Sequence, residues 1–239
     1  MTNEPICGEC GNMLRGNYYQ IGNARFYEKH RTDPACSFCG IPSSWKFDNF
    51  RYCRRCALTA IRTPAAARTI ITDVSRSMTK RELAVPTPVR ITLADSRRLA
   101  SKGLNNGPHH HGVTEIEYFH GTTQPTNVEI TVRMGLPDIQ CRATVAHEFG
   151  HAFMAHQCLF DVPLVLSEGF AELASYAYLY HDVATVEARA ECRSISRRPD
   201  LYGVGFRRVY EIVKRIGLAE FIRRLQVNPT DDFVQFPTQ

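Results

Sequence analysis

Long hydrophobic runs are missing from this chain of 239 residues, and no stretch approaches the roughly 20 apolar residues that a membrane-spanning helix needs. The N-terminus, MTNEPICGEC, also lacks the basic and then apolar pattern of a secretory signal peptide. Low-complexity tracts and internal repeats are absent, and the composition, 44% hydrophobic and 22% charged, is that of a globular protein. We therefore expect a protein that resides in the cytoplasm and does not contact a membrane.

Blocks of a single charge sign are missing too. The formal net charge is only +5, and the basic residues fall in short pairs rather than in one patch. Arginine pairs on helix faces are usually solvated surface, so we do not expect nucleic acid to be the partner. The pairs occupy positions 54–55, 97–98, 197–198, 207–208 and 223–224.

Cysteine, by contrast, is abundant. The chain has nine cysteines, an odd number, and six of them fall between residues 7 and 56. In a cytoplasmic protein such crowding indicates metal ligation rather than disulfides. The other three, Cys141, Cys158 and Cys192, have helical contexts and are expected to pack as small hydrophobes.

The six clustered cysteines form three C-x-x-C pairs, a spacing that lets both thiolates reach one tetrahedral zinc ion. A histidine and an aspartate lie between the first two pairs, which gives the register C-x2-C-x19-H-x2-D-x2-C-x2-C-x13-C-x2-C. This register resembles a LIM domain, which holds two zinc ions in consecutive knuckles. Closed four-ligand sites are structural, because they stabilise a module that is too small for its own core.

The LIM resemblance implies two ligand sets and a protein partner, since modules of this type usually bind protein. Asp33 stands where most LIM domains have cysteine, and Glu28 competes for the same place. The last spacer is also shorter than usual. The first zinc takes Cys7, Cys10, His30 and Asp33, and the second takes Cys36, Cys39, Cys53 and Cys56.

The segment ATVAHEFGHAFMAHQC, residues 143–158, carries a different metal signal, an H-E-x-x-H motif. On a helix, His147 and His151 lie on one face about one turn apart, which suits two imidazoles on one ion. Glu148 is displaced around the helix, where it reaches a metal-bound water without being a ligand, as a general base does. Two exposed histidines on an amphipathic helix are the alternative.

The next histidine does not complete this site. His156 is five residues beyond His151, roughly 140° around the helix, so it points off the metal face and is expected at the surface or beside the site. A metzincin needs glycine and histidine where this chain has Met154 and Gln157, so that class is excluded. The histidines at 109–111 are expected to form a solvated turn.

The segment LSEGFAELASYAYL supplies the missing ligand on a following antiparallel helix, with Ser167 as a natural N-cap. We assign Glu168 as the third ligand, because two histidines and one glutamate leave an open position for water, as in catalytic zinc sites. Glu172, one turn on, is expected to orient a ligating imidazole, or else to pair with an arginine. Tyr202 is a candidate donor to the oxyanion, or else a packing residue.

The order of elements predicts an α+β protein. Residues 1–60 form the LIM-like zinc module, residues 61–84 a connecting helix, and residues 85–239 a minimal metallopeptidase domain with a few-stranded sheet. We expect strand 126–134 to run beside the active helix and pair with an extended substrate. The expected strands are 88–95, 113–120 and 126–137, and the expected helices are 138–158, 167–181, 183–195, 204–216 and 218–226.

This order of parts resembles the LIM-containing, ubiquitin-activated peptidases that limit organ size in plants, and their shorter bacterial relatives. The resemblance rests on GLPDIQCRATVAHEFGHAFM, LSEGFAEL and YGVGFRRVYEIVKRIGLAEFIRRL, and on the gap of sixteen residues between His151 and Glu168. It covers most of the chain, from Cys7 to the last helix. The ubiquitin-interacting helices that precede the LIM region in the plant proteins are not in this sequence, so ubiquitin binding is not carried over.

The resemblance implies a zinc endopeptidase of the gluzincin type that acts on proteins or peptides, with one catalytic and up to two structural Zn2+ ions. In the expected reaction zinc activates a water, and Glu148 takes its proton and passes it to the leaving amine. A catalytically silent, zinc-stabilised interaction module is the alternative. The intact Glu148 argues against that alternative, because a decaying site has no need to keep its base.

Overall fold

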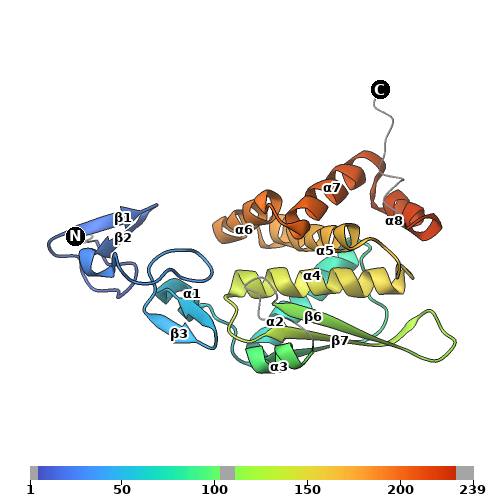
Figure 1. Ribbon diagram of the computed structural model, residues 1–239, viewed down its shortest axis with the longest axis horizontal. Coiled ribbons are helices and arrows are strands. Elements are labelled where there is room, and N and C mark those ends of the chain that lie inside the picture. The colour runs from blue at the N-terminus through green and yellow to red at the C-terminus, as the bar shows by residue number, and fades with distance from the viewer. Residues whose placement is uncertain (1–4, 103–110, 230–239) are drawn as a thin grey trace.

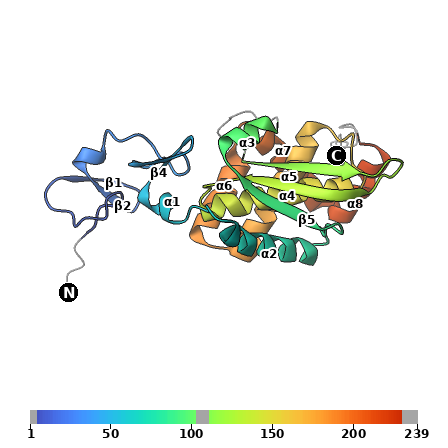
Figure 2. The ribbon, with the colours of Figure 1, turned by 90° about the horizontal axis from the view of Figure 1, so that it is seen from below.

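The structure, a computed structural model, describes residues 5–102 and 111–229. A small N-terminal part with two β-hairpins lies at one end of the molecule, and a larger body of sheet and helices makes up the rest (Figures 1 and 2). The predicted α+β class is confirmed. Within the described ranges, no helix is long and apolar enough to cross a bilayer.

The N-terminal part consists of short elements, as expected where metal ligands rather than a large core hold the chain. Both hairpins are antiparallel: β1 pairs with β2, and β3 pairs with β4. The elements are β1 (Tyr18–Ile21), β2 (Ala24–Tyr27), the 3-10 helix η1 (Glu28–His30), β3 (Trp45–Phe47), β4 (Phe50–Tyr52) and α1 (Arg54–Leu58).

A three-stranded sheet forms one layer of the body. Its strands are β5 (Val89–Ala94), β6 (Gly112–Tyr118) and β7 (Pro125–Arg133), in the order β5-β7-β6. Strand β5 is parallel to β7, and β6 is antiparallel to it. The prediction that strand 126–134 pairs with a substrate is therefore wrong, because β7 is central and both of its edges are occupied. Strand β6 lies at the edge of the sheet instead.

Helices cover one face of the sheet and form further layers above it (Figure 1). Helix α4 lies on the sheet, α5 lies on α4, and α7 lies on α5. Val128, Ile130 and Val132 of β7 are fully buried in the core that these layers enclose. The helices are α2 (Pro64–Lys80), α3 (Ser96–Ser101), α4 (Asp138–His156), α5 (Leu164–Tyr178), the π-helix η2 (Leu179–Val183), α6 (Val186–Arg197), α7 (Leu201–Ile216) and α8 (Leu218–Val227).

The helices lie near the predicted positions, with two differences. Helix α5 begins at Leu164 with Pro163 as its N-cap, and the Pro163 carbonyl already accepts hydrogen bonds from the backbone of residues 166 and 167. Ser167 therefore lies inside the helix and does not cap it, contrary to the prediction. Helix α3 was not predicted, because its six residues are too few to show a helical period.

Helices α5 and α7 meet through their backbones. A Cβ atom on Gly169 would lie 2.3 Å from the carbonyl oxygen of Gly205, and a Cβ atom on Gly205 would lie 2.2 Å from that of Val165. Only glycine permits so close an approach, because it has no side chain. This contact fixes the start of α5 against the first turns of α7.

The apolar core runs from the body into the N-terminal part. A separate small cluster holds Cys7, Leu14 and Phe26, so the first cysteine pair lies outside the main core. The second and third pairs lie within or against it. The main cluster includes Cys36, Phe50, Tyr52, Cys53 and Cys56 of the N-terminal part together with Val128, Leu136 and Val145 of the body.

Hydrogen bonds reinforce this shared core. The hydroxyl of Tyr52 donates to the carbonyl oxygen of Gly135 at 2.7 Å. The backbone of Ile61 accepts from Gly135 at 2.7 Å and donates to Leu136 at 2.8 Å. These bonds hold the second half of the N-terminal part directly ahead of α4.

Gly169→Ala is expected to destabilise the body, because the added methyl group would press on the backbone of α7. Overpacking of this kind lowers the free energy of unfolding by about 1–3 kcal/mol, which urea denaturation at saturating zinc would measure. Ser167→Ala, at a half-buried position of the same helix, is the control and should change that free energy by less than about 0.5 kcal/mol. Equal stability of the two variants would contradict a backbone contact between α5 and α7.

Candidate metal centres

Helices α4 and α5 bring His147, His151 and Glu168 into one group. The two Nε2 atoms lie 3.1 Å apart, and Oε2 of Glu168 lies 3.1 Å from Nε2 of His147 and 3.5 Å from Nε2 of His151. Ligand atoms at tetrahedral corners around zinc, with bonds of about 2.0–2.1 Å, are separated by about 3.3 Å. The three atoms therefore already have the spacing of zinc ligands, and the group is compatible with a zinc site.

The electrostatics of this group fit a cation. Burial disfavours a charged His147, but the hydrogen bond with Glu168 and the carboxylates of Glu172 and Glu148 outweigh it and raise the pKa of His147 to about 9. Burial opposes ionisation of Glu168 as well, yet the hydrogen bonds from His147 and His151 hold its pKa far below the usual range. The surroundings thus stabilise one positive charge at this position, which a bound zinc ion would supply.

Glu148 is buried beside the group but is not part of it. Its Oε2 accepts a hydrogen bond of 2.8 Å from the hydroxyl of Thr114 on β6, and its backbone carbonyl accepts one of 3.1 Å from the same hydroxyl. A Cβ atom on Gly112 would lie 2.6 Å from Oε1 of Glu148. The edge strand thus positions this carboxylate through one threonine and one glycine. Sequence reasoning missed both, although a glycine in a strand often signals a close approach.

Glu172 combines the two predicted alternatives. Its Oε1 lies 3.8 Å from Nδ1 of His147, on the side of the ring away from the group, and 3.1 Å from Nη1 of Arg198. The carboxylate therefore faces the imidazole and also pairs with an arginine. Arg198 also contacts Asp200 at 2.7 Å, and sequence reasoning missed it because only the tertiary fold brings it to α5.

Tyr202 lies in the first turn of α7, on the opposite side of the group from β6. Its ring centroid is 6.0 Å from that of His147, and the Arg198 guanidinium lies 4.7 Å from the Tyr202 ring centroid. Burial, together with the Glu168 carboxylate, raises the pKa of Tyr202 to about 12. The hydroxyl therefore keeps its proton at neutral pH and can donate a hydrogen bond.

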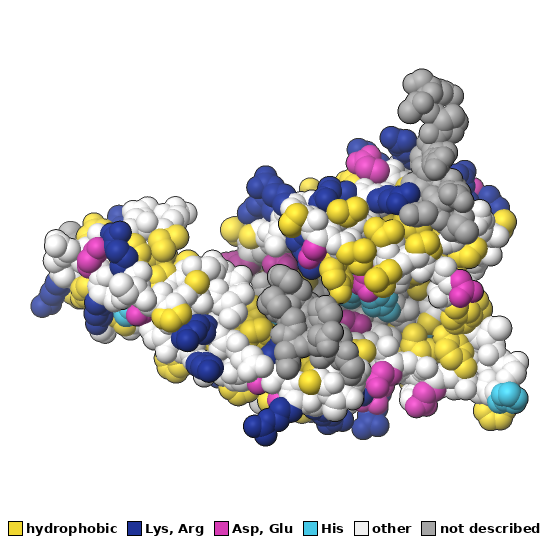
Figure 3. All heavy atoms as spheres, in the orientation of Figure 1, with side chains coloured by type: hydrophobic (Ala, Val, Ile, Leu, Met, Phe, Trp, Pro, Cys, Tyr) yellow, Lys and Arg dark blue, Asp and Glu magenta, His cyan; other side chains and the backbone are white. Residues whose placement is uncertain are grey.

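These residues line an open cleft of about 520 Å3. The start of β6 forms one wall, α4 forms the floor, and α5, α6 and α7 form the other wall. Figure 3 shows histidine and acidic side chains at the bottom of this hollow, between the upper helices and the sheet.

The other histidines singled out in the sequence lie in surroundings that differ from the predicted ones. His156 is not part of the group, as expected, but it is buried rather than at the surface. His109 and His110 lie outside the described residues, whereas His111 lines the cleft and lies edge-on to Phe50, with ring centroids 5.6 Å apart, instead of forming a solvated turn.

Of the three cysteines outside the N-terminal part, two match the prediction and one does not. Cys141 and Cys192 are buried, as predicted for small hydrophobes, but Cys158 is exposed. Cys158 follows Gln157, the C-cap of α4, and its φ of 57° is in the left-handed region, so it lies outside the predicted helical context.

The second cysteine knuckle has the geometry of a closed zinc site. Cys36, Cys39, Cys53 and Cys56 form one group. Sγ of Cys39 lies 3.6 Å from that of Cys53 and 3.8 Å from that of Cys56, close to the separation of about 3.8 Å expected at a tetrahedral zinc with bonds of about 2.3 Å. Hydrogen bonds, first from Cys39 and then from the other two thiols, hold the pKa of Cys36 far below its usual range, whereas the hydrogen bonds with Cys36 raise the pKa of Cys53 and Cys56.

The first knuckle gathers three of its four predicted ligands. Cys7, Cys10 and His30 form a group, and Nε2 of His30 is buried without a hydrogen-bond partner among the described residues. Asp33 lies on the other ring nitrogen, with Oδ2 2.6 Å from Nδ1. Glu28, the competing carboxylate, pairs with Arg31 at 2.6 Å. Asp33 thus orients His30 in this arrangement, and neither carboxylate occupies the predicted ligand position.

No protein-family model, no curated protein and no solved structure matches this chain. Function is therefore inferred from the three groups of metal-binding side chains and from the cleft.

Asp33→Ala is expected to weaken zinc binding at the first knuckle without abolishing it, because the carboxylate holds the ring of His30. Loss of such an orienting partner lowers metal affinity by about 10- to 100-fold, measured by competition with a chelator. At saturating zinc the metal content should equal that of the wild type. Glu28→Gln, at an exposed carboxylate, serves as the control. A lower zinc content in Asp33→Ala at saturation would instead identify Asp33 as a ligand.

Zinc binding to the His147 group is expected to strengthen as pH rises. Without metal the imidazole of His147 keeps its proton up to about pH 9, and zinc binds only the deprotonated ring. One proton leaves for each zinc bound, so the apparent affinity should rise by up to about tenfold per pH unit from neutral pH towards that pKa. Chelator competition with the cysteine sites already filled measures this dependence, and a flat profile would contradict it.

Proposed function

We propose that this protein is a zinc-dependent peptidase that hydrolyses peptide bonds in polypeptide substrates. The observation that carries this proposal is the position of Glu148, a carboxylate beside the His147, His151 and Glu168 group but not within it, in an open cleft. A purely structural metal site is closed by four protein ligands and has no use for such a carboxylate. Zinc held by the three ligands would supply Lewis acidity, which lowers the pKa of water and polarises a carbonyl group.

Glu148 acts as the general base and then as the general acid. Thr114 binds one of its oxygens at 2.8 Å, which fixes the orientation of the carboxylate and leaves the other oxygen next to Gly112 at the wall of the cleft. From there it removes a proton from the attacking water and delivers it to the leaving amine. Alignment by Thr114 reduces the reorganisation that proton transfer requires.

Strand β6 is the proposed site for the substrate backbone. It is an edge strand with β7 on one side, and residues 111–114 line the cleft beside Glu148. An extended peptide that adds to this edge makes main-chain hydrogen bonds whatever its sequence. This mode of binding suits a polypeptide substrate and takes the role that the sequence predicted for strand 126–134.

Tyr202 is the proposed donor to the oxyanion. It projects from the wall opposite β6, and Arg198 packs on its ring at 4.7 Å, which restricts its movement. Its raised pKa keeps the hydroxyl protonated, as a hydrogen-bond donor to developing negative charge must be. Glu172 supports the same site from behind, since it faces His147 and pairs with Arg198.

Glu148→Gln is expected to lower kcat by about 10²–10⁴-fold while the zinc content stays unchanged, because glutamine keeps the size of the side chain but cannot take a proton. The measurement is new peptide termini from a proteome-derived library, together with metal analysis. Glu117→Gln, at the far end of β6, is the control and should cleave like the wild type. If the wild type and Glu148→Gln yield the same termini, the chain is not a peptidase of this mechanism.

A further inference from the structure

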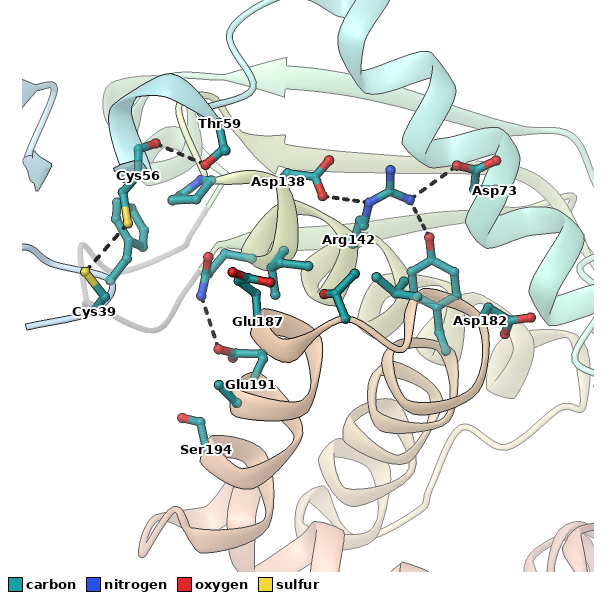
Figure 4. Close-up of a pocket in the computed structure, with 18 of the residues that line it drawn as sticks. Cys39, Cys56, Thr59, Asp73, Asp138, Arg142, Asp182, Glu187, Glu191 and Ser194 are labelled. Atoms are coloured by element: carbon teal, nitrogen blue, oxygen red, sulfur yellow. Dashed lines mark hydrogen bonds and ion pairs between the residues drawn. The ribbon is translucent and has the colours of Figure 1, made fainter. Parts of the chain in front are cut away.

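A second, larger cavity of about 910 Å3 adjoins the cleft (Figure 4). Residues of α1 and the second zinc knuckle, including Cys39 and Cys56, form one side of it, and α2, the start of α4 and α6 form the other. Gln140, Glu191 and Ser194 line both spaces, so the cavity and the cleft adjoin at these three residues. A substrate that passes the metal group towards the start of α4 would enter this cavity.

The carboxylates around the cavity differ in how they are paired. Glu191 accepts a single hydrogen bond of 3.1 Å from the neutral amide of Gln140 and has no ion-pair partner within the described residues. The other lining carboxylates each lie near a cation. These pairs are Asp73 with Arg142 at 3.3 Å, Asp138 with Arg142 at 2.8 Å, Asp182 with Arg81 at 2.6 Å, and Glu187 with Arg55 at 4.0 Å.

The charge balance of the cleft leaves room for a further cation. The cleft is lined by the carboxylates of Glu148, Glu168, Glu172 and Glu191 and by one arginine, Arg198. A dication on the metal group together with Arg198 offsets three of these negative charges and leaves one. Burial, followed by the nearby Glu172 carboxylate, raises the pKa of Glu191, and these two effects outweigh the opposing hydrogen bond from Gln140 and the charge of Arg198.

We propose that Glu191 binds the side chain of a lysine or arginine in the substrate polypeptide. This inference rests on the proposed peptidase function and assigns a substrate class to it. A long basic side chain fits the place, because its charged end reaches Glu191 while its methylene groups lie against apolar lining atoms such as those of Ile139 and Ala190.

The fold also sets the distance of this residue from the cleaved bond. Gln140, the partner of Glu191, precedes His147 by seven positions on α4, which corresponds to about 10 Å along the helix axis. An extended peptide advances about 3.3 Å per residue. The basic residue therefore lies about three positions from the scissile bond, on the same side in every substrate. Beyond it the polypeptide continues towards the zinc knuckle.

Binding without cleavage tests this site. In the zinc-loaded Glu148→Gln variant, we expect a labelled peptide with lysine about three positions from the scissile bond to bind more tightly than the same peptide with norleucine in place of that lysine. Adding Glu191→Gln should weaken binding of the lysine peptide by about 10- to 100-fold, as loss of a charge-assisted hydrogen bond does, and change the norleucine peptide less than about twofold. Glu187→Gln, the same change one helical turn away on the exposed rim, should alter neither.

Cleavage by the otherwise wild-type enzyme provides the second measurement. Glu191→Gln should lower kcat/KM for lysine peptides by the same factor and leave kcat for norleucine peptides unchanged, with zinc content and thermal unfolding as checks on the fold. Equal losses for both peptides, or an equal effect of Glu187→Gln, would overturn the assignment. If the wild type binds the lysine peptide selectively but cleaves nothing, the peptidase function is rejected and the binding of a basic side chain by Glu191 stands. If it cleaves peptides without any preference for lysine, the peptidase function stands and the role of Glu191 is rejected.

Discussion

The candidate catalytic site depends on one close contact, between Gly150 of α4 and Ala171 of α5. A Cβ atom on Gly150 would lie 2.8 Å from Cα of Ala171, so the two helices approach as closely as their backbones allow. Gly150 lies between His147 and His151, and Ala171 lies one turn after Glu168. The glycine therefore sets the distance at which a carboxylate from one helix meets two imidazoles on the other. A larger residue would separate these ligands before it affected any of them directly.

Around this contact, each layer of the fold contributes one component. The sheet edge supplies Thr114 and Gly112, which fix Glu148, and α7 supplies Tyr202 across the cleft. The backbone contact between α5 and α7 holds the third layer against the second. The helix layers are thus held by backbone contacts that carry no charge, whereas hydrogen bonds and ion pairs orient the polar side chains between them.

The part of the site that depends on residue spacing within one helix could be predicted from the sequence. The part that depends on contacts between distant segments could not. The spacing of His147 and His151 and the following helix with Glu168 are properties of short segments, so the sequence alone brought them together. The order of the strands is not local, and for that reason β7 was mistaken for the edge next to the substrate. Arg198 reaches Glu172 only through the packing of distant segments. Asp33 fits a ligand register by spacing, but its carboxylate bonds to the nitrogen of His30 that faces away from the metal group.

The two cysteine knuckles, both candidate metal sites, differ in how they are joined to the rest of the protein. The second shares its apolar core with the body and borders the cavity beside the cleft, whereas the first has a small cluster of its own. Metal binding at the second knuckle is therefore part of the folding free energy of the whole body. Metal binding at the first would act on that small cluster, which is joined to the second half of the N-terminal part by Glu9, whose carboxylate accepts hydrogen bonds from the backbone of Ser44 and Arg54. Loss of metal is therefore expected to have unequal consequences at the two cysteine sites, with the larger effect on the body from the second.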